Sequence, residues 1–350
     1  MKNRRSFRPP VNSDAVATLI LNLVRTMKTM KIFCDMKLAG EALRLLEQGV
    51  APHQVVYPAI PAQSVLAQAA FDPAMAEADV AFGQPAVASV LAAKRLRWVQ
   101  VSSAGYTRFD TPEFRAAAAA TGLALTNSSA VFAGPCAEHV LAFLLAQARV
   151  LPAALRTQCA GGTPEWDALR RACSPLGEQR ILLLGYGAIA LRLVELLRPF
   201  GSPITAYRRR ARGDEMVPIV TAEGLPAALA AADAVIDILP DNAESRDFFT
   251  AERFAQMKPG AVFYNIGRGT TVDQSALVAA LHSGRLAAAW LDVTEPEPLP
   301  PGHPLLSAPN CHLTPHIAGG HGREYESLVR HFLDNFSRFV AGSPLRDRVM

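Results

Sequence analysis

The sequence predicts an α/β fold with two parallel-sheet domains, and three observations support this. Short apolar runs of strand length alternate with helical patterns from Met30 to about Asn127. The same alternation begins again at Arg180, with clearer edges, and continues through "CHLTPH". Strands that alternate with helices are typical of βα units around a parallel sheet. The chain has 350 residues, which is enough for two domains that each bury a core.

Composition and charge narrow the class of protein. Hydrophobic residues make up 50% of the chain and charged residues 19%, which is ordinary for a globular protein and argues against wholesale disorder. The 35 basic and 31 acidic residues are too balanced to predict a nucleic-acid surface. The five cysteines are scattered and form no CxxC pair. We therefore expect reduced thiols, a cytoplasmic location, no disulfide framework and no metal site.

Residues 1–29 are expected to be a poorly ordered extension, or to precede a natural start at Met30. A basic start and the apolar run "AVATLILNLV" outline a signal peptide, but no small-residue cleavage site follows. Export stays open as the alternative. This run is too short to cross a bilayer, and no other segment is expected to span a membrane.

The elements follow in order along the chain. The first half contains the runs "KIFC", "EALRLLEQG", "ADVAFG", "RWVQVSSAG" and "LALTNSS". Residues 137–151, "AEHVLAFLLAQARVL", are apolar on nearly every side and predict a buried helix. A polar, irregular stretch with Gly161, Gly162 and Pro164 is expected next. The strands of the second half are "ILLL", "ITAY", "AVIDIL", "AVFYNI", "AAAWLDV" and "CHLTPH". The last helix, "EYESLVRHFLDNFSRFVAG", is expected to fold back onto the first domain.

The run "ILLLGYGAIALRLVELL" predicts a dinucleotide site. Gly185-x-Gly187-x-x-Ala190 lies between an apolar strand and a helix. The glycines permit a tight turn and let the backbone approach a pyrophosphate at the helix N-terminus, while Ala190 is small enough for close helix–strand packing. A plain βα turn is the alternative reading.

The residues after the next strand favour NADPH over NADH. About 20 residues beyond such a glycine loop, an acid holds the ribose 2′-hydroxyl of NAD, whereas an arginine accommodates the 2′-phosphate of NADP. That region carries Arg208 and Arg209, and no acid precedes Asp214. Arginine offers planar, charge-assisted hydrogen bonds to phosphate. We expect NADPH or NADP as cofactor, with NADH as a further option. A solvated basic turn is the alternative.

Three later strands finish in polar residues. Arg268 follows "AVFYNI", Asp292 follows "AAAWL" and His316 follows "CHLTP". In open α/β sheets, ligands bind outside the carboxyl ends of the strands. We therefore expect these three side chains to gather at one site.

With these motifs in view, the chain resembles the D-isomer-specific 2-hydroxyacid dehydrogenases over about Met30 to Val349. The resemblance rests on "GYGAIA", on the segment from Ile238 to Pro300, and on "HPLLSAPNCHLTPHIAGG". "EPEPLPPGHPLL" and the arginines after the second strand look most like the glyoxylate/hydroxypyruvate reductases. The resemblance implies a doubly wound Rossmann domain, residues 130–318, inserted into a smaller flavodoxin-like substrate domain, residues 30–129 plus 319–350. It also implies a small 2-oxo acid as substrate and a homodimer.

The resemblance assigns roles as well. Arg268 would anchor and polarise the substrate, His316 would protonate its carbonyl oxygen, and Glu297 (not Glu295) would keep that imidazole charged. Asp292 would hold the nicotinamide amide. The substrate carboxylate would bind the backbone N–H groups of Ala104 and Gly105, assisted by Ser103. The other expected cofactor contacts are Gly185, Tyr186, Gly187, Ala188, Ile189, Arg208, Arg209, Leu239, Pro240, Ile266 and Gly267.

The predicted activity is therefore NADPH-dependent reduction of small 2-oxo acids to D-2-hydroxy acids. Two alternatives stay open: an NAD(H)-binding sensor similar to transcriptional corepressors, and an NAD-linked dehydrogenase of D-2-hydroxy acids. Arg208 argues against both, because both resemble NAD binders. Formate dehydrogenases of the same superfamily carry glutamine at the position of Glu297, which counts against that activity. No nucleic-acid, membrane or metal partner is expected.

Overall fold

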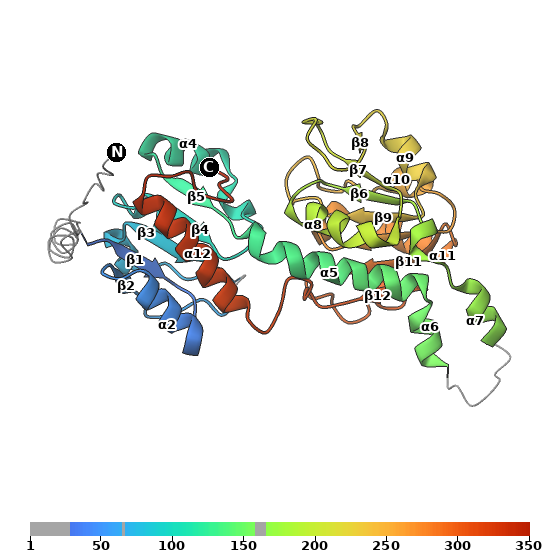
Figure 1. Ribbon diagram of the computed structural model, residues 1–350, viewed down its shortest axis with the longest axis horizontal. Coiled ribbons are helices and arrows are strands. Elements are labelled where there is room, and N and C mark those ends of the chain that lie inside the picture. Colours follow the sequence, from blue (N-terminus) through green and yellow to red (C-terminus); the bar gives the residue numbers. More distant parts are fainter. Residues whose placement is uncertain (1–28, 65–66, 158–165) are drawn as a thin grey trace, which may run out of the picture. The chain divides into compact units, whose positions relative to one another are not determined.

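The computed structural model describes residues 29–64, 67–157 and 166–350. These residues form two compact units, each built on a parallel sheet (Figure 1). The first unit comprises residues 29–64, 67–102, 112–126 and 329–350, and the second comprises 103–111, 127–157 and 166–328. The predicted α/β class with two parallel-sheet domains is confirmed. Residues 1–28 of the predicted extension and the stretch around Gly161, Gly162 and Pro164 lie outside the described residues.

The first unit has strand order β2-β1-β3-β4-β5, which is the flavodoxin-like order. All neighbouring strands of this sheet are parallel. Its strands are β1 (Lys31–Cys34), β2 (Gln54–Val56), β3 (Val80–Gly83), β4 (Trp98–Val101) and β5 (Ala124–Thr126). Its helices are α2 (Gly40–Gly49), α3 (Val87–Ala92), α4 (Pro112–Thr121) and most of α12 (Glu324–Val340).

Helix α12 packs against this sheet. The Phe332 side chain is fully buried, and its ring stacks on those of Phe82 and Trp98, with centroid distances of 4.3 and 5.2 Å. The Asn335 amide also donates a hydrogen bond of 2.9 Å to the Gln100 side chain on β4. The prediction that the last helix folds back onto the first domain is confirmed.

The second unit has strand order β12-β11-β10-β9-β6-β7-β8, again with parallel neighbours. The chain runs outward from β6 to β8 and then returns to β9 on the other side of β6. In a doubly wound sheet, ligands bind beside the strand ends at this point of reversal. The strands are β6 (Ile181–Leu184), β7 (Ile204–Tyr207), β8 (Ile219–Val220), β9 (Ala234–Asp237), β10 (Ala261–Asn265), β11 (Leu286–Leu291) and β12 (Cys311–Leu313).

Sequence patterns missed two strands, β2 and β8. They have only three and two residues, lie at sheet edges and are partly exposed, so neither forms a run of buried residues. The helices of the second unit are α5 (Ser129–Ala148), α6 (Leu151–Arg156), α7 (Trp166–Ala172), α8 (Ala188–Leu197), α9 (Leu225–Ala231), α10 (Ala251–Gln256) and α11 (Gln274–His282).

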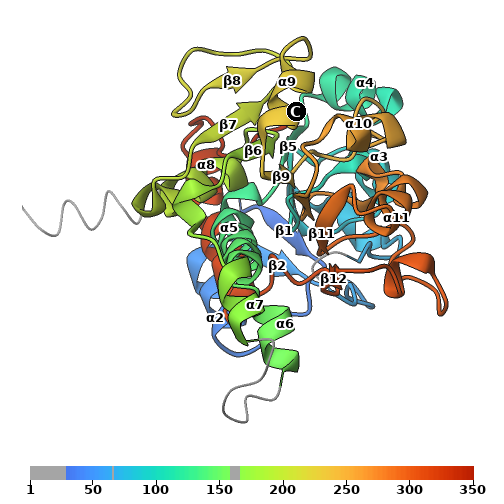
Figure 2. The same ribbon diagram turned by 90° about the vertical axis from the view of Figure 1, so that its right-hand side faces the viewer.

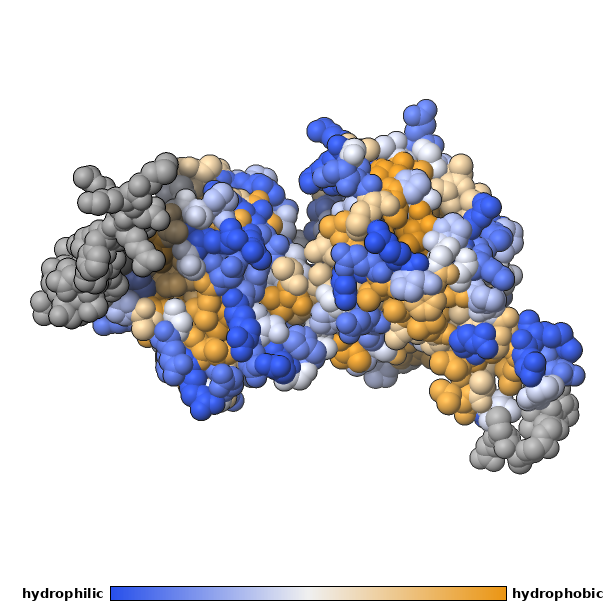
Figure 3. Space-filling view, viewed as in Figure 1, coloured by the Kyte–Doolittle hydropathy of each residue, from blue (hydrophilic) through white to orange (hydrophobic). Residues whose placement is uncertain are grey.

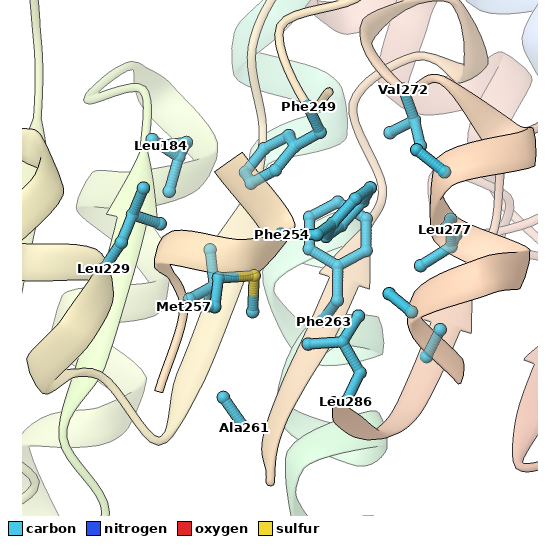
Figure 4. Close-up of a cluster of buried hydrophobic side chains, with 14 of the residues drawn as sticks. Leu184, Leu229, Phe249, Phe254, Met257, Ala261, Phe263, Val272, Leu277 and Leu286 are labelled. Carbon is cyan, nitrogen blue, oxygen red and sulfur yellow. The ribbon is translucent and has the colours of Figure 1, made fainter. Parts of the chain in front are cut away.

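One face of this sheet packs against α9, α10 and α11. Figure 4 shows the buried side chains of this core, with Phe263 of β10 close to Phe249 and to Phe254 of α10. The Phe263 ring lies 4.6 Å from that of Phe249 and 5.4 Å from that of Phe254. Burial of these aromatic side chains fixes the position of β10. The predicted catalytic residue Arg268 follows the end of this strand.

The other face packs against α5, which also packs against α8 (Figure 2). The Trp290 indole N–H on β11 donates to Gln147 of α5 at 2.8 Å, and its ring lies 4.9 Å from Phe143. The predicted boundaries 137–151 are wrong, because α5 begins at Ser129 and ends at Ala148. The helix ends early because Val150 adopts a left-handed conformation, with φ of 46°, before α6 begins. Helices α6 and α7 were not predicted either.

Helix α5 also corrects the expectation that no segment beyond the N-terminal run could span a membrane. By length and composition this helix, with a mean hydropathy of 1.5 in its most apolar window, could do so, and 39% of that window is buried. The core helix of a globular protein passes the same test, and the contacts of Phe143 and Gln147 with β11 are those of such a helix.

Candidate active site

The glycine-rich turn lies at the reversal point of the second sheet. Gly185, directly after β6, has φ of 104°, and a Cβ there would lie 3.1 Å from the Ile238 carbonyl oxygen that follows β9. Gly187 is the N-cap of α8, and a Cβ there would meet no atom within 4 Å. Ala190 is 1% exposed, so it lies against the sheet as expected. The N-terminus of α8 therefore faces open space.

A pocket of about 970 Å³ opens beside this turn. Its lining residues are Gly185, Tyr186, Gly187, Tyr207, Arg208, Arg209, Arg210, Ala211, Arg212, Leu239, Pro240, Asn242, Glu244, Ser245 and Phe248. The structure thus brings together seven of the predicted cofactor residues. The other five, Ala188, Ile189, Ile266, Gly267 and Asp292, do not line this pocket. Sequence reasoning missed Arg210, Arg212 and the polar turn after Pro240, although the run of arginines continued visibly to Arg212.

The two arginines singled out from the sequence differ in their surroundings. The Arg208 guanidinium is 18% exposed and donates to Glu215 at 2.7 Å. Arg209 pairs with Glu244, but their side chains are 72% and 65% exposed. Ion pairs at such exposure contribute little to stability. A solvated basic turn therefore describes Arg209 but not Arg208.

Arg268 lies where three segments approach one another. A Cβ on Gly267 would lie 2.8 Å from the Leu239 carbonyl oxygen, so only glycine fits between the ends of β10 and β9. The Arg268 guanidinium donates to the Gly267 carbonyl at 2.6 Å. A Cβ on Gly105 would collide with the same guanidinium. The structure thus places Arg268 against the predicted substrate loop.

That loop, Ser103 to Gly105, is held by its own side chains and by Asn127. The Ser103 hydroxyl donates to the Gly105 carbonyl at 2.5 Å, and the Asn127 amide donates to the Ala104 carbonyl at 2.7 Å. No acceptor for the N–H groups of Ala104 and Gly105 lies among the residues that the structure describes. Two backbone donors thus remain for a ligand, while Ser103 shapes the loop.

His316 and Glu297 form a hydrogen-bonded pair. His316 Nδ1 lies 2.8 Å from Glu297 Oε2, and the Thr294 N–H donates to Glu297 Oε1 at 3.2 Å. Partial burial raises the pKa of Glu297, but His316, the Thr294 N–H and the charge of Arg268 together hold it below its ordinary value. Glu297 is therefore an anion near neutral pH, hydrogen-bonded to the His316 ring.

Asp292 anchors the turn that carries His316. This carboxylate is 1% exposed and accepts hydrogen bonds from the Thr314 hydroxyl at 2.6 Å and from the N–H groups of Ile317 and Ala318 at 2.9 and 2.8 Å. His316 itself has φ of 52°, a left-handed conformation that is costly for a non-glycine residue unless its surroundings hold it. The Asp292 carboxylate is therefore directed toward the turn that carries His316.

A buried polar network under the site was not predicted. Asp237, the last residue of β9, is fully buried and accepts from the Thr271 hydroxyl at 2.5 Å and from the Leu239 N–H at 3.0 Å. Asn265 donates to the Arg268 carbonyl at 2.9 Å and accepts from the Gly267 N–H. Burial raises the pKa of Asp237 to about 7, against the lowering effect of these two hydrogen bonds. The network therefore holds the two segments that approach each other at Leu239 and Gly267.

His139 of α5 lies close to Asp292 and Thr314. Its Nε2 is 3.3 Å from the Thr314 hydroxyl and 3.8 Å from the Asp292 carboxylate. Burial lowers the pKa of His139, although Asp292 opposes this. Among residues 29–64, 67–157 and 166–350, no group of three or more His, Cys, Asp or Glu could hold a metal ion.

Comparison with known proteins identifies the family. The profile of the D-isomer specific 2-hydroxyacid dehydrogenase, NAD binding domain, matches residues 141–318. The chain belongs to the D-isomer specific 2-hydroxyacid dehydrogenase family. Members of this family are oxidoreductases that act on CH–OH donors. The resemblance inferred from the sequence is thereby confirmed.

Within the 2-hydroxyacid dehydrogenase family, the chain is similar to reductases. It is 36% identical to glyoxylate/hydroxypyruvate reductase B of Citrobacter koseri, over 71% of this chain and 76% of that protein. It is 36% identical to the glyoxylate reductase/hydroxypyruvate reductase of Mus musculus over 56% of this chain, spanning 60% of the mouse protein's length. A crystal structure of the NADPH-dependent glyoxylate/hydroxypyruvate reductase from Sinorhizobium meliloti, with NADP and malonate, is similar with a TM-score of 0.69. Its identity is 27%, over 92% of this chain and 97% of that one.

The raised pKa of Asp237 predicts a pH-dependent contribution to stability. The folded protein binds the Asp237 proton more tightly than the unfolded chain does, so this contribution to the free energy of unfolding falls as pH rises from about 4 to about 7. Asp237→Asn removes that slope. Denaturant titrations across this interval should show the wild type losing stability relative to D237N. Asp167→Asn, on exposed α7, is the control, and a difference that does not change with pH would contradict the assignment.

Proposed function

We propose that this protein reduces small 2-oxo acids of the glyoxylate or hydroxypyruvate type to D-2-hydroxy acids, with NADPH as reductant. The observation that carries the proposal is the grouping of Arg268 with the His316–Glu297 pair in the unit whose glycine-rich turn opens on an arginine-lined pocket. The relatives named as glyoxylate/hydroxypyruvate reductases support the same substrate class.

The residues at the reversal point fit a phosphorylated dinucleotide. The open space at Gly187 allows a pyrophosphate to approach the N-terminus of α8, where backbone N–H groups and the helix dipole favour an anion. The pocket side chains Arg208, Arg210 and Arg212 supply positive charge for a 2′-phosphate. Leu239 and Pro240 supply apolar surface in the same pocket. When bound, reduced nicotinamide would supply a hydride.

The chain's own residues would bind the acid and move the proton. The free N–H groups of Ala104 and Gly105 would bind the substrate carboxylate, and the adjacent Arg268 guanidinium would bind and polarise the 2-oxo group. His316, as imidazolium, would give its Nε2 proton to the carbonyl oxygen, which becomes the hydroxyl. Glu297, bound to Nδ1, would fix the orientation of the ring and stabilise its charge. Asp292 would position this turn while lying near the nicotinamide amide.

The family resemblance and the free thiols extend the proposal to the assembly and its location. The four described cysteines, Cys34, Cys136, Cys173 and Cys311, are all free. We place the enzyme in the cytoplasm as a homodimer joined through the cofactor unit. Apolar side chains exposed on α6, α7 and α8 support such an interface, and apolar surface over α6 is visible in Figure 3. They include Leu155 at 83% exposure, Trp166 at 53% and Leu191 at 40%.

Turnover is the first test of the activity. NADPH oxidation, followed by its absorbance, should be rapid with glyoxylate or hydroxypyruvate and slower with phenylpyruvate. His316→Gln should lower kcat by about 10² to 10⁴-fold while dinucleotide binding stays intact, because only the proton donor is lost. Glu195→Gln, on the exposed face of α8, is the control. Tight dinucleotide binding without turnover of any 2-oxo acid would instead favour the sensor function.

The cofactor assignment has its own test. Arg208→Asp should raise the Michaelis constant for NADPH at least tenfold more than that for NADH, since a phosphate would face a carboxylate in place of a guanidinium. Steady-state kinetics with each dinucleotide measure the two constants. Equal effects on both would contradict the 2′-phosphate site.

The assembly can be tested by one substitution. Leu155→Asp should convert the dimer to a monomer with an unchanged circular dichroism spectrum, because the side chain is 83% exposed within the chain. Light scattering coupled to size exclusion gives the mass, with Arg44→Ala, on exposed α2 of the first unit, as a surface control. A variant that keeps the wild-type mass would place the interface elsewhere.

A further inference from the structure

The segment from Arg208 to Met216, here called the arginine loop, is folded around a carboxylate. It connects β7 to the edge strand β8 (Figure 2). Glu215 Oε1 accepts from Arg208 Nη1 at 2.7 Å and from the Arg212 N–H at 2.8 Å. Glu215 Oε2 accepts from the Gly213 N–H at 2.8 Å. A single side chain thus joins the first residue of the loop to its far end.

The Glu215 carboxylate is well enclosed. It is 5% exposed, whereas Arg209 and Glu244, the other ion pair of this region, are both more than half exposed. The Arg212 N–H contributes most to lowering the pKa of Glu215, burial opposes it, and Gly213 and Arg208 add to the lowering, which brings the pKa to about 2. Glu215 is therefore a charged acceptor throughout the neutral range.

A second contact fastens the arginine loop to the glycine-rich turn. The Met216 N–H donates to the Tyr186 hydroxyl at 2.9 Å. The Arg208 guanidinium carbon lies 5.9 Å from the centroid of the Tyr186 ring. Tyr186, between the two glycines of the turn, therefore joins the loop that would hold a 2′-phosphate to the turn that would hold the pyrophosphate.

The pocket-facing charges follow from this arrangement. Arg208, Arg209, Arg210 and Arg212 all line the pocket, and no acidic partner for Arg210 or Arg212 lies among the described residues. Arg208 uses Nη1 for Glu215, and its Nε and Nη2 donors have no hydrogen-bond partner in the part of the chain that the structure describes. Fixing such a guanidinium before binding reduces the conformational entropy lost when the ligand binds.

We propose that Glu215 is a positioning residue for the 2′-phosphate of NADPH, so that an acid in the arginine loop strengthens the binding of an anion. Its carboxylate folds the loop and holds Arg208 toward the pocket, and Tyr186 fixes the other end. This inference rests on the proposed NADPH dependence and assigns the specificity to residues beyond Arg208. A Coulomb argument alone predicts the opposite sign, because removing a negative charge near a phosphate should strengthen binding.

The test is whether removing the Glu215 carboxylate weakens or strengthens NADPH binding. Calorimetric titrations of wild type, Glu215→Ala and Glu215→Gln would use NADPH, NADH and the half-molecules adenosine 2′,5′-bisphosphate and 5′-AMP. E215A should weaken NADPH and the bisphosphate by about tenfold or more, the scale of a lost charge-assisted hydrogen bond, and change NADH and 5′-AMP by less than about threefold. E215Q should weaken them less, because its amide oxygen can still accept from Arg208 and Arg212.

Two further variants separate positioning from general damage. Tyr186→Phe removes only the acceptor for Met216 and should weaken the bisphosphate in the same direction but to a smaller extent. Glu195→Gln, an acid of α8 paired with Arg192 on the surface, should change neither ligand. Thermal unfolding of each variant checks that the fold is retained.

The outcomes distinguish the inference from the function on which it rests. Tighter NADPH binding by E215Q, or equal weakening of NADPH and NADH by E215A, would overturn the inference. Wild-type protein that prefers NADPH, with unaltered preference in both variants, would overturn the inference alone. Wild-type protein that binds both dinucleotides equally would contradict the proposed cofactor itself, before any variant is compared.

Discussion

The rest of the site depends on the hydrogen bonds between the Asp292 carboxylate and the turn after β12. Three donors from the segment Thr314 to Ala318 converge on this one buried group. They hold His316 in a left-handed backbone conformation that an unsupported chain would leave. The imidazole therefore meets Glu297 at a fixed point, and strain in the backbone is balanced by the hydrogen bonds that the turn donates to Asp292, the residue after β11.

A second constraint is the closeness of the connections that leave β6, β9, β10 and β11. Backbone meets backbone at Gly267, and a Cβ on Gly269 would collide with the carbonyl group of Thr294. The buried polar groups of Asp237, Thr271 and Asn265 occupy the same region. Because these connections are closely packed, side chains that follow separate strands can converge on one site.

Much of this arrangement could be predicted from the sequence. The two parallel sheets, the glycine-rich turn and the positions of Arg268, Asp292 and His316 at strand ends all follow from local patterns and from the rule that parallel strands end at one edge. Glu215 and Asp237 could not be predicted in this way. Asp237 meets Thr271, 34 residues away, and Glu215 acts through backbone N–H groups whose directions depend on how the loop folds. The start of α5 was missed because Gly134 and Pro135, residues that commonly interrupt a helix, lie inside its first half. Its end was missed because the helix breaks at Val150, two residues before Pro152, and not at the last apolar residue of the run.

The contact between Gly105 and Arg268 limits how the proposed substrate loop can be altered. A side chain at position 105 would displace the end of the Arg268 guanidinium, so a substitution there would also move the arginine. Ser103 and Asn127 are constrained as well, because they donate hydrogen bonds to the carbonyl groups of the same loop. Libraries that alter the proposed substrate loop should therefore leave residues 103–105 intact and vary the residues from Tyr106 onward.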